Sequence, residues 1–130
     1  MKPKLRVWIV FGERLKFGDG RARLLELIDS RGSLRQAAAA FDMSYRNAWG
    51  YLGELERAAG FKLVERGPDG TARSGMRLTD AGREFVRAYR RFQRNLEAAA
   101  VRHFDGSFKG QTFRRRARRD VSRRGAAGST

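Results

Sequence analysis

The residues best suited to chemistry lie in one short polar segment, Ser44–Tyr51, with the sequence SYRNAWGY. The Arg46 guanidinium and the Asn47 carboxamide match the hydrogen-bonding edges that guanine and adenine present in the DNA major groove. Gly50 has no side chain, so the backbone there would allow a partner to approach closely. The segment therefore predicts contacts with nucleic-acid bases.

The side chains that other chemistry needs are missing or isolated. The chain has no cysteine, and its single histidine, His103, has no second histidine or cysteine with which to share a metal. The glycine-rich run from Gly67 to Gly75 lacks the Lys-Ser/Thr pair of a phosphate-binding loop. No carboxylate pair stands in an apolar setting that would suit acid–base catalysis. We therefore expect no enzymatic activity, no catalytic residue, no metal site and no cofactor.

Two predicted helices joined by a tight turn, residues 33–60, would hold the polar segment. Ser33 and Ser44 each stand where a helix N-cap is needed, and Gln36 completes a capping box with Ser33. The apolar residues of the first helix fall on one stripe: Leu34, Ala37, Ala38 and Phe41. This pattern is typical of a helix-turn-helix, although an ordinary helical hairpin shows it too.

The second helix is predicted to bury one face and to expose the other. Its apolar residues recur at 4-3-4 spacing, with an indole beside them: Ala48, Leu52, Leu55, Ala59 and Trp49. Its outer face presents polar or small residues: Arg46, Asn47, Gly50 and Tyr51. We expect the outer face to be the reading surface and Trp49 to hold it against the core.

The residues before this helix pair predict a strand and a helix. Residues 5–11 alternate with a period of two and favour a strand, whereas residues 12–18 favour a loop. Asp19 offers an N-cap for a helix that runs to about Arg31 and ends at Gly32. This helix would pack across the pair and give it a core.

The residues after the helix pair predict a β-hairpin. Residues 61–66 and 76–78 are strand candidates, and the Gly-Pro-Asp-Gly sequence at 67–70 is a strong turn signal. Thr71 and Arg73 make the tip small, polar and basic. A basic hairpin directly after a helix-turn-helix is typical of a wing, and the alternative is a plain hairpin with a solvated tip.

A long helix is predicted from its cap at Thr79 to about Arg102. Its apolar seam has a heptad-like spacing and comprises Phe85, Tyr89, Phe92, Leu96 and Ala99. Part of this seam must cover the domain's own core, yet the helix extends beyond so small a body. We favour a homodimer interface along the seam over a helix that folds back across one monomer.

The charge of the chain favours a polyanionic partner. Its 29 basic and 14 acidic residues give a net charge of +15 over 130 residues, and both the body and the tail contribute to it. Neutralising phosphates releases condensed counterions, so such a surplus favours nucleic-acid binding.

We divide the chain into a domain at residues 1–104, with its dimerisation helix at about 79–102, and a basic tail without fixed structure at 105–130. No apolar run is long enough for a membrane span or a signal peptide, so we expect a cytoplasmic protein.

Three short motifs in order, SYRNAW, LVER and LTDAG, resemble the winged helix-turn-helix domain of the molybdate-dependent regulator ModE family. The helix-turn-helix and the LTDAG stretch are also similar to those of LysR-type regulators. The resemblance implies a mainly α fold with a small β component, and a homodimeric transcription factor that binds double-stranded DNA. The residues expected to contact DNA are Ser33, Arg35, Ser44, Tyr45, Arg46, Asn47, Gly50, Tyr51, Arg66, Thr71 and Arg73.

Two departures from the family limit what the resemblance implies. Asp42 stands in the turn where the family often has glycine, and aspartate tolerates the left-handed conformation there. The oxyanion-binding domains of molybdate sensors would follow the long helix, and the residues after Arg102 are too few and too polar for one. We therefore do not expect this chain to bind molybdate.

The alternative functions are an architectural, sequence-independent nucleoid-type DNA binder and, less favoured, an RNA-binding module.

Overall fold

The computed structural model describes residues 1–67 and 75–113, and its elements follow the order of a winged helix-turn-helix. Two short strands come first and two more form the base of the hairpin: β1 (Ile9–Phe11), β2 (Leu15–Phe17), β3 (Val64–Arg66) and β4 (Met76–Leu78). The helices are α1 (Asp19–Arg31), α2 (Leu34–Ala39), α3 (Tyr45–Ala59) and α4 (Asp80–Phe108). The mainly α fold with a small β component is therefore confirmed.

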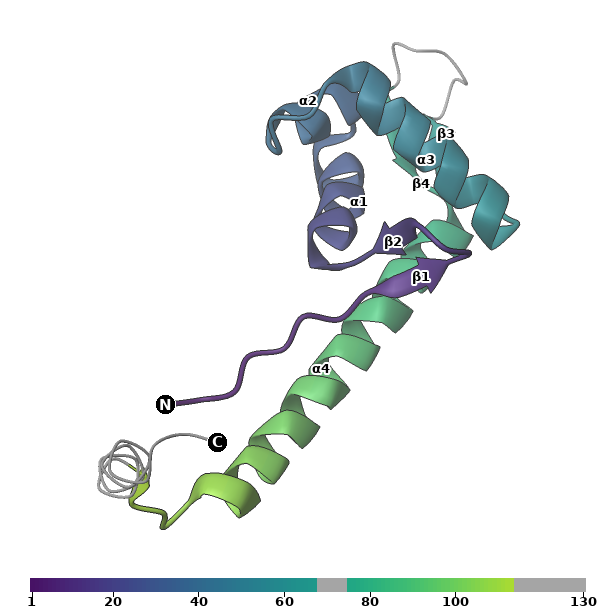
Figure 1. Cartoon of the computed structure of the whole chain (residues 1–130). Helices are drawn as coiled ribbons and strands as arrows, with labels where there is room; N and C mark the ends of the chain where they lie inside the picture. Colours follow the sequence, from purple (N-terminus) through teal and green to yellow (C-terminus); the bar gives the residue numbers. More distant parts are fainter. Residues whose placement is uncertain (68–74, 114–130) are drawn as a thin grey trace, which may run out of the picture.

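The core lies between α1, α2, α3 and the β3–β4 hairpin, and α4 runs from this body as a long arm (Figure 1). The buried side chains of α1 are its leucines, Ala22 and Ile28, and Leu52 and Leu55 of α3 pack among them. The first turns of α4 close the core with Val86 and Tyr89. Burial of these apolar surfaces is the main force that fixes the three short helices relative to one another.

The N-terminal region differs from the prediction in two respects. The strand is shorter than residues 5–11, and the predicted loop at 12–18 contains β2, which pairs antiparallel with β1 across a turn at Gly12. The reason is Phe17, which is fully buried and packs edge-on against the rings of Phe85 and Tyr89. In addition, Gly18 rather than Asp19 is the N-cap of α1, and no side chain caps it.

The turn between α2 and α3 forms as predicted. The Ser33 hydroxyl accepts a hydrogen bond from the Gln36 N–H, and the Ser44 hydroxyl accepts one from the Asn47 N–H. Asp42 adopts a left-handed conformation with a φ of 55°. It is the one non-glycine residue with positive φ among the residues described. The turn therefore holds the two helices at a fixed angle.

The long helix continues past the predicted end at Arg102 to Phe108. Residues 105–108, assigned by the sequence to a tail without fixed structure, are its last turn. Phe104 and Phe108 lie four residues apart on one face, and their rings stack with centroids 4.8 Å apart. Residues 109–113 follow the end of α4, and the last part of the predicted tail, residues 114–130, lies outside the described residues.

Candidate nucleic-acid interface

The outer face of α3 is set by the residues that the helix buries. Ala48, Leu52 and Leu55 are fully buried against the core. Since successive residues turn by about 100° around a helix, the line opposite these three contains Arg46, Gly50, Gly53 and Arg57. Two arginines therefore flank two glycines along the outermost line of the helix.

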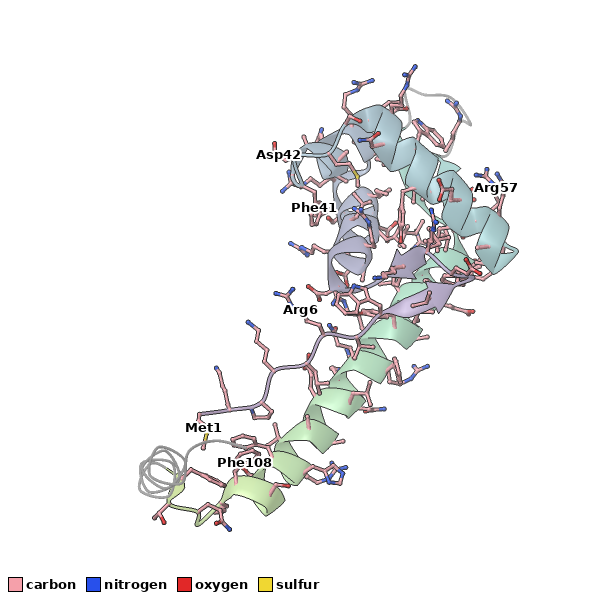
Figure 2. The ribbon with its side chains drawn as sticks, viewed as in Figure 1. Met1, Arg6, Phe41, Asp42, Arg57 and Phe108 are labelled. Carbon is pink, nitrogen blue, oxygen red and sulfur yellow. The ribbon has the colours of Figure 1, made fainter. Side chains whose placement is uncertain are left out.

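The two glycines leave the backbone of α3 accessible between the arginines. Apart from the adjacent residues and the nearby backbone of α3 itself, no described atom lies within 4 Å of the position that a Cβ of Gly50 would take. At Gly53 the neighbour within that distance is the guanidinium of Arg57, at 3.4 Å. Figure 2 shows Arg57 on the outer side of α3. Arg57 is not among the predicted DNA contacts, although its position eleven residues after Arg46 places it on the same line.

Trp49 does not hold α3 against the core, contrary to the prediction. Its side chain is 38% exposed, and it forms an edge-to-face pair with Tyr45, which is 37% exposed. The guanidinium of Arg35 lies 4.4 Å from the centre of the Tyr45 ring. The prediction failed because Trp49 is turned about 90° from the buried line, toward the base of the hairpin rather than into the core.

Tyr51 lies on the opposite flank of α3 and is engaged within the domain. Its hydroxyl donates a hydrogen bond to the carbonyl oxygen of Lys16 at 3.0 Å, and the Arg21 guanidinium lies 4.7 Å from its ring centre. Burial raises the pKa of the Tyr51 hydroxyl, so it stays protonated and can donate this bond. Tyr51 thus fastens the N-terminal hairpin to α3.

The base of the wing is fixed to both α3 and the α1–α2 corner. The Glu56 carboxylate accepts hydrogen bonds from the N–H groups of Leu63 and Val64, at 2.7 and 3.2 Å. On the other strand, the Met76 N–H donates to the carbonyl of Gly32 at 3.0 Å. A Cβ at Gly75 would overlap that same carbonyl, and the φ of Gly75 is +78°. These contacts set the direction in which the hairpin leaves the body.

The predicted DNA-contacting residues gather around this end of the molecule, with exceptions. Those brought together at the start of α2, the start of α3 and the end of β3 are Ser33, Arg35, Ser44, Tyr45, Arg46, Asn47, Gly50 and Arg66. Ser33 and Ser44 act as helix caps. Tyr51 faces the N-terminal hairpin instead. Thr71 and Arg73 lie outside the described residues.

The LTDAG stretch has a structural role at the joint between the wing and α4. Thr79 caps α4 by accepting a hydrogen bond from the Gly82 N–H, and its hydroxyl donates to the carbonyl of Lys62. Its own N–H donates to the carbonyl of Leu63. A Cβ at Gly82 would overlap the Leu63 carbonyl, so only glycine allows α4 to start so close to the wing.

Two arginines of α4 bind carboxylates of α1. Arg83 donates two hydrogen bonds to Asp29, which also accepts one from the Leu78 N–H. Arg90 binds Glu26 through two nitrogens and contacts Asp19 as well. The hydrogen bond to Glu26 raises the pKa of Arg90, and that to Arg90 lowers the pKa of Asp19. These ion pairs fix the direction of the α4 arm.

The predicted dimer seam divides between the core and the surface. Tyr89 is 1% exposed and donates a hydrogen bond to the carbonyl of Val7, and Phe85 packs partly buried against the core. Neither residue presents its ring freely to a second chain, so the prediction is wrong for Tyr89 and at most partial for Phe85. Phe92 is 47% exposed, and Leu96 and Ala99 are partly exposed.

In residues 1–67 and 75–113, no three histidine, cysteine, aspartate or glutamate side chains lie where they could hold a metal ion. Over the same ranges, no helix combines the length and the apolar character that crossing a membrane requires.

Comparison with known proteins agrees with this geometry. Residues 21–83 match the family described as bacterial regulatory helix-turn-helix protein, lysR family. The chain is 37% identical over 84 residues to the molybdenum transport protein ModE of Azotobacter vinelandii, which covers 65% of this chain and 31% of that protein. It is 34% identical over 74 residues to the molybdenum-pterin-binding protein MopA of Rhodobacter capsulatus, covering 57% of this chain and 28% of that protein.

A third relative is the DNA-binding transcriptional dual regulator ModE of Escherichia coli, which is 28% identical over 89 residues, covering 68% of this chain and 34% of that protein. The chain thus spans about a third of the length of these relatives. The predicted resemblance to ModE and to LysR-type helix-turn-helix regulators is confirmed. Residues 21–83, in which two capped helices meet at Asp42, thus match the bacterial regulatory helix-turn-helix family of the lysR type, and the chain is similar to ModE.

Proposed function

We propose that this chain is a DNA-binding transcriptional regulator that reads the major groove with α3. The observation that carries the proposal is the exposed line of Arg46, Gly50, Gly53 and Arg57 within a lysR-type helix-turn-helix. Arginine pairs bidentately with guanine, and a glycine between two arginines lets the helix backbone approach the base edges. Asn47, on the flank of this line, suits adenine.

Phosphate contacts would position the reading helix. Arg35 at the start of α2 and Arg66 at the end of β3 line the same hollow beside the start of α3. Such contacts fix the register of a protein on the duplex without reading sequence. The chain's net charge of +15 supplies the sequence-independent part of the affinity.

The proposal includes a homodimer formed through the distal part of α4. The helix has 29 residues, so it is about 44 Å long, and within the described part of the chain none of its residues from 91 to 108 is buried. Apolar side chains remain exposed there, including Phe92 at 47% and Val101 at 49%. A second copy would cover them and would place two α3 helices on a palindromic site. The proposal does not include molybdate binding, because the family match lies on the helix-turn-helix.

The test is a selection of bound duplexes from a random pool by the whole chain. We expect a palindrome whose half-sites lie one or more helical turns apart. Replacing Arg46 by Ala should relax the preference at one base pair in each half-site, with a loss of about 1–3 kcal/mol of discrimination there. The control is Arg87→Ala, which removes an exposed arginine of α4 and should leave the motif unchanged.

The result also separates this function from an architectural DNA binder. Recovery of no enriched motif, with affinity that depends steeply on salt and not on sequence, would favour the architectural function. A uniform loss of affinity in Arg46→Ala, at every sequence, would make Arg46 a phosphate contact instead.

A further inference from the structure

The aromatic pair Tyr45–Trp49 borders a hollow on the side of α3 that faces the wing. The hollow has a volume of about 260 Å³, and its lining residues come from the starts of α2 and α3 and from the base of the wing. Arg35 and Arg66 line it as well as the two aromatic rings. An apolar surface thus lies between two cations, beside the line that we assign to the major groove.

Both rings of the pair make contacts within the domain although they are exposed. The ring of Tyr45 makes an edge-to-face contact with Trp49, with centroids 6.1 Å apart, and also contacts the Arg35 guanidinium. Such contacts fix both ring orientations before any partner binds. The pair leaves more than a third of each side chain exposed at the surface. This arrangement presents aromatic area toward a ligand that the flanking arginines attract.

Among polyanions, duplex DNA presents an apolar group in its major groove, the C5-methyl of thymine. We propose that Trp49, oriented by Tyr45, is a specificity-determining residue that packs on a thymine methyl, while Arg35 and Arg66 hold the neighbouring phosphates. This inference rests on the proposed function, because it requires α3 to lie in the major groove. It adds a base contact that hydrogen-bonding side chains do not supply.

The test compares thymine with deoxyuridine, which differs by that one methyl group. In the duplex obtained by selection, each thymine is replaced singly by deoxyuridine and the affinity of the whole chain is measured. We expect one thymine in each half-site at which the change weakens binding about fourfold, the effect of exposing one buried methyl group. Trp49→Ala should bind both duplexes equally. Phe61→Ala is the matched control, because Phe61 is 36% exposed at the other end of α3, and it should keep the fourfold difference.

A second measurement does not depend on the folding of Trp49→Ala. Deoxyuridine with iodine at C5 replaces the sensitive thymine, and illumination should crosslink it to Trp49 or Tyr45 of the unaltered chain. A motif without sensitivity to thymine at any position, or a crosslink that falls on other residues, overturns the inference and leaves the proposed function intact. If selection returns no motif, the proposed function fails and this inference fails with it.

Discussion

The two halves of α4 share one helix but differ in what surrounds them. The first half buries Gly82, Val86 and Tyr89, and its arginines at 83 and 90 bind carboxylates of α1. Residues 91–108, all described, include no buried residue, and Phe92, Val101 and Phe108 are each more than 40% exposed. The first half is part of the monomer core, whereas the second extends from the body (Figure 1).

The difference shows that an apolar pattern along a helix does not identify what covers it. The seam from Phe85 to Ala99 keeps the same spacing through both halves. Its first two residues meet the core and its last three do not. The environment therefore decides whether a seam residue stabilises the monomer or remains available to a second chain.

The largest effect is expected from breaking the attachment of the first half with Gly82→Ala. The new methyl group would overlap the carbonyl of Leu63, so α4 must move away from the wing. We expect the free energy of unfolding to fall by about 2–3 kcal/mol, since overpacking outweighs the better helix propensity of alanine. Chemical denaturation monitored by circular dichroism measures the change.

The control for this variant is the same substitution in α3, where the new methyl group would have no described atom within 4 Å apart from its adjacent residues and the nearby backbone of its own helix. Gly50→Ala should raise the free energy of unfolding by up to about 1 kcal/mol. It should also weaken DNA binding if the helix backbone approaches the bases. An equal loss of stability in both variants would show that contact with Leu63 is not the cause. An unchanged DNA affinity in Gly50→Ala would contradict the close approach.

The second half of α4 can be probed with Leu96→Glu. If the exposed half of the seam forms the dimer, a buried carboxylate there opposes association and a leucine contact is lost. We expect the dissociation constant of the dimer to rise about 10–100-fold, because the substitution removes roughly 1.5–3 kcal/mol of apolar burial. Sedimentation measures the dissociation constant.

Ala98→Glu is the matched control, because it adds the same charge at an exposed position on the opposite face of the same turn. It should associate like the unaltered chain. If Ala98→Glu weakens association as much as Leu96→Glu, repulsion between the helices explains the effect and the seam is not the interface.

The sequence predicted those parts of the fold that local chemistry decides. Ser33 and Ser44 could be identified as caps because a hydroxyl before a helical stripe has one common use. The left-handed turn at Asp42 and the helix end at Gly32 follow from backbone preferences. The base of the wing was predicted from the turn signal at 67–70 and the short apolar strands on either side.

Features that depend on tertiary contacts could not be predicted in this way. Phe17 turned a predicted loop into β2 because its ring is buried between Phe85 and Tyr89, and no local pattern shows that contact. Trp49 was assigned to the core by its type, but a large side chain on the flank of a helix is exposed when the neighbouring element is a thin hairpin. The position of Arg57 on the outer line was available from helical spacing alone.

The smallest effect concerns the ion pairs that tie the first half of α4 to α1. Partial burial alone would raise the pKa of Asp29, but the Arg83 guanidinium and the Leu78 N–H lower it below its usual value. A carboxyl with a lowered folded-state pKa stabilises the fold above its unfolded pKa of about 3.9 and loses that contribution as pH falls further. We expect Asp29→Asn to be less stable than the unaltered chain at pH 7, by no more than about 1 kcal/mol, and the gap to close below about pH 4.

Denaturation at a series of pH values measures that gap, and Asp80→Asn is the control. Asp80 binds the same Arg83 but its side chain is fully exposed, so its ion pair should contribute little at any pH. A gap for Asp29→Asn that persists unchanged at pH 3 would mean that the Asp29 side chain acts there by its shape and its hydrogen bonds rather than by its charge. The attachment of the first half would then depend on packing and on the Thr79–Gly82 joint, and the contrast with the second half of α4 would not involve ion pairs.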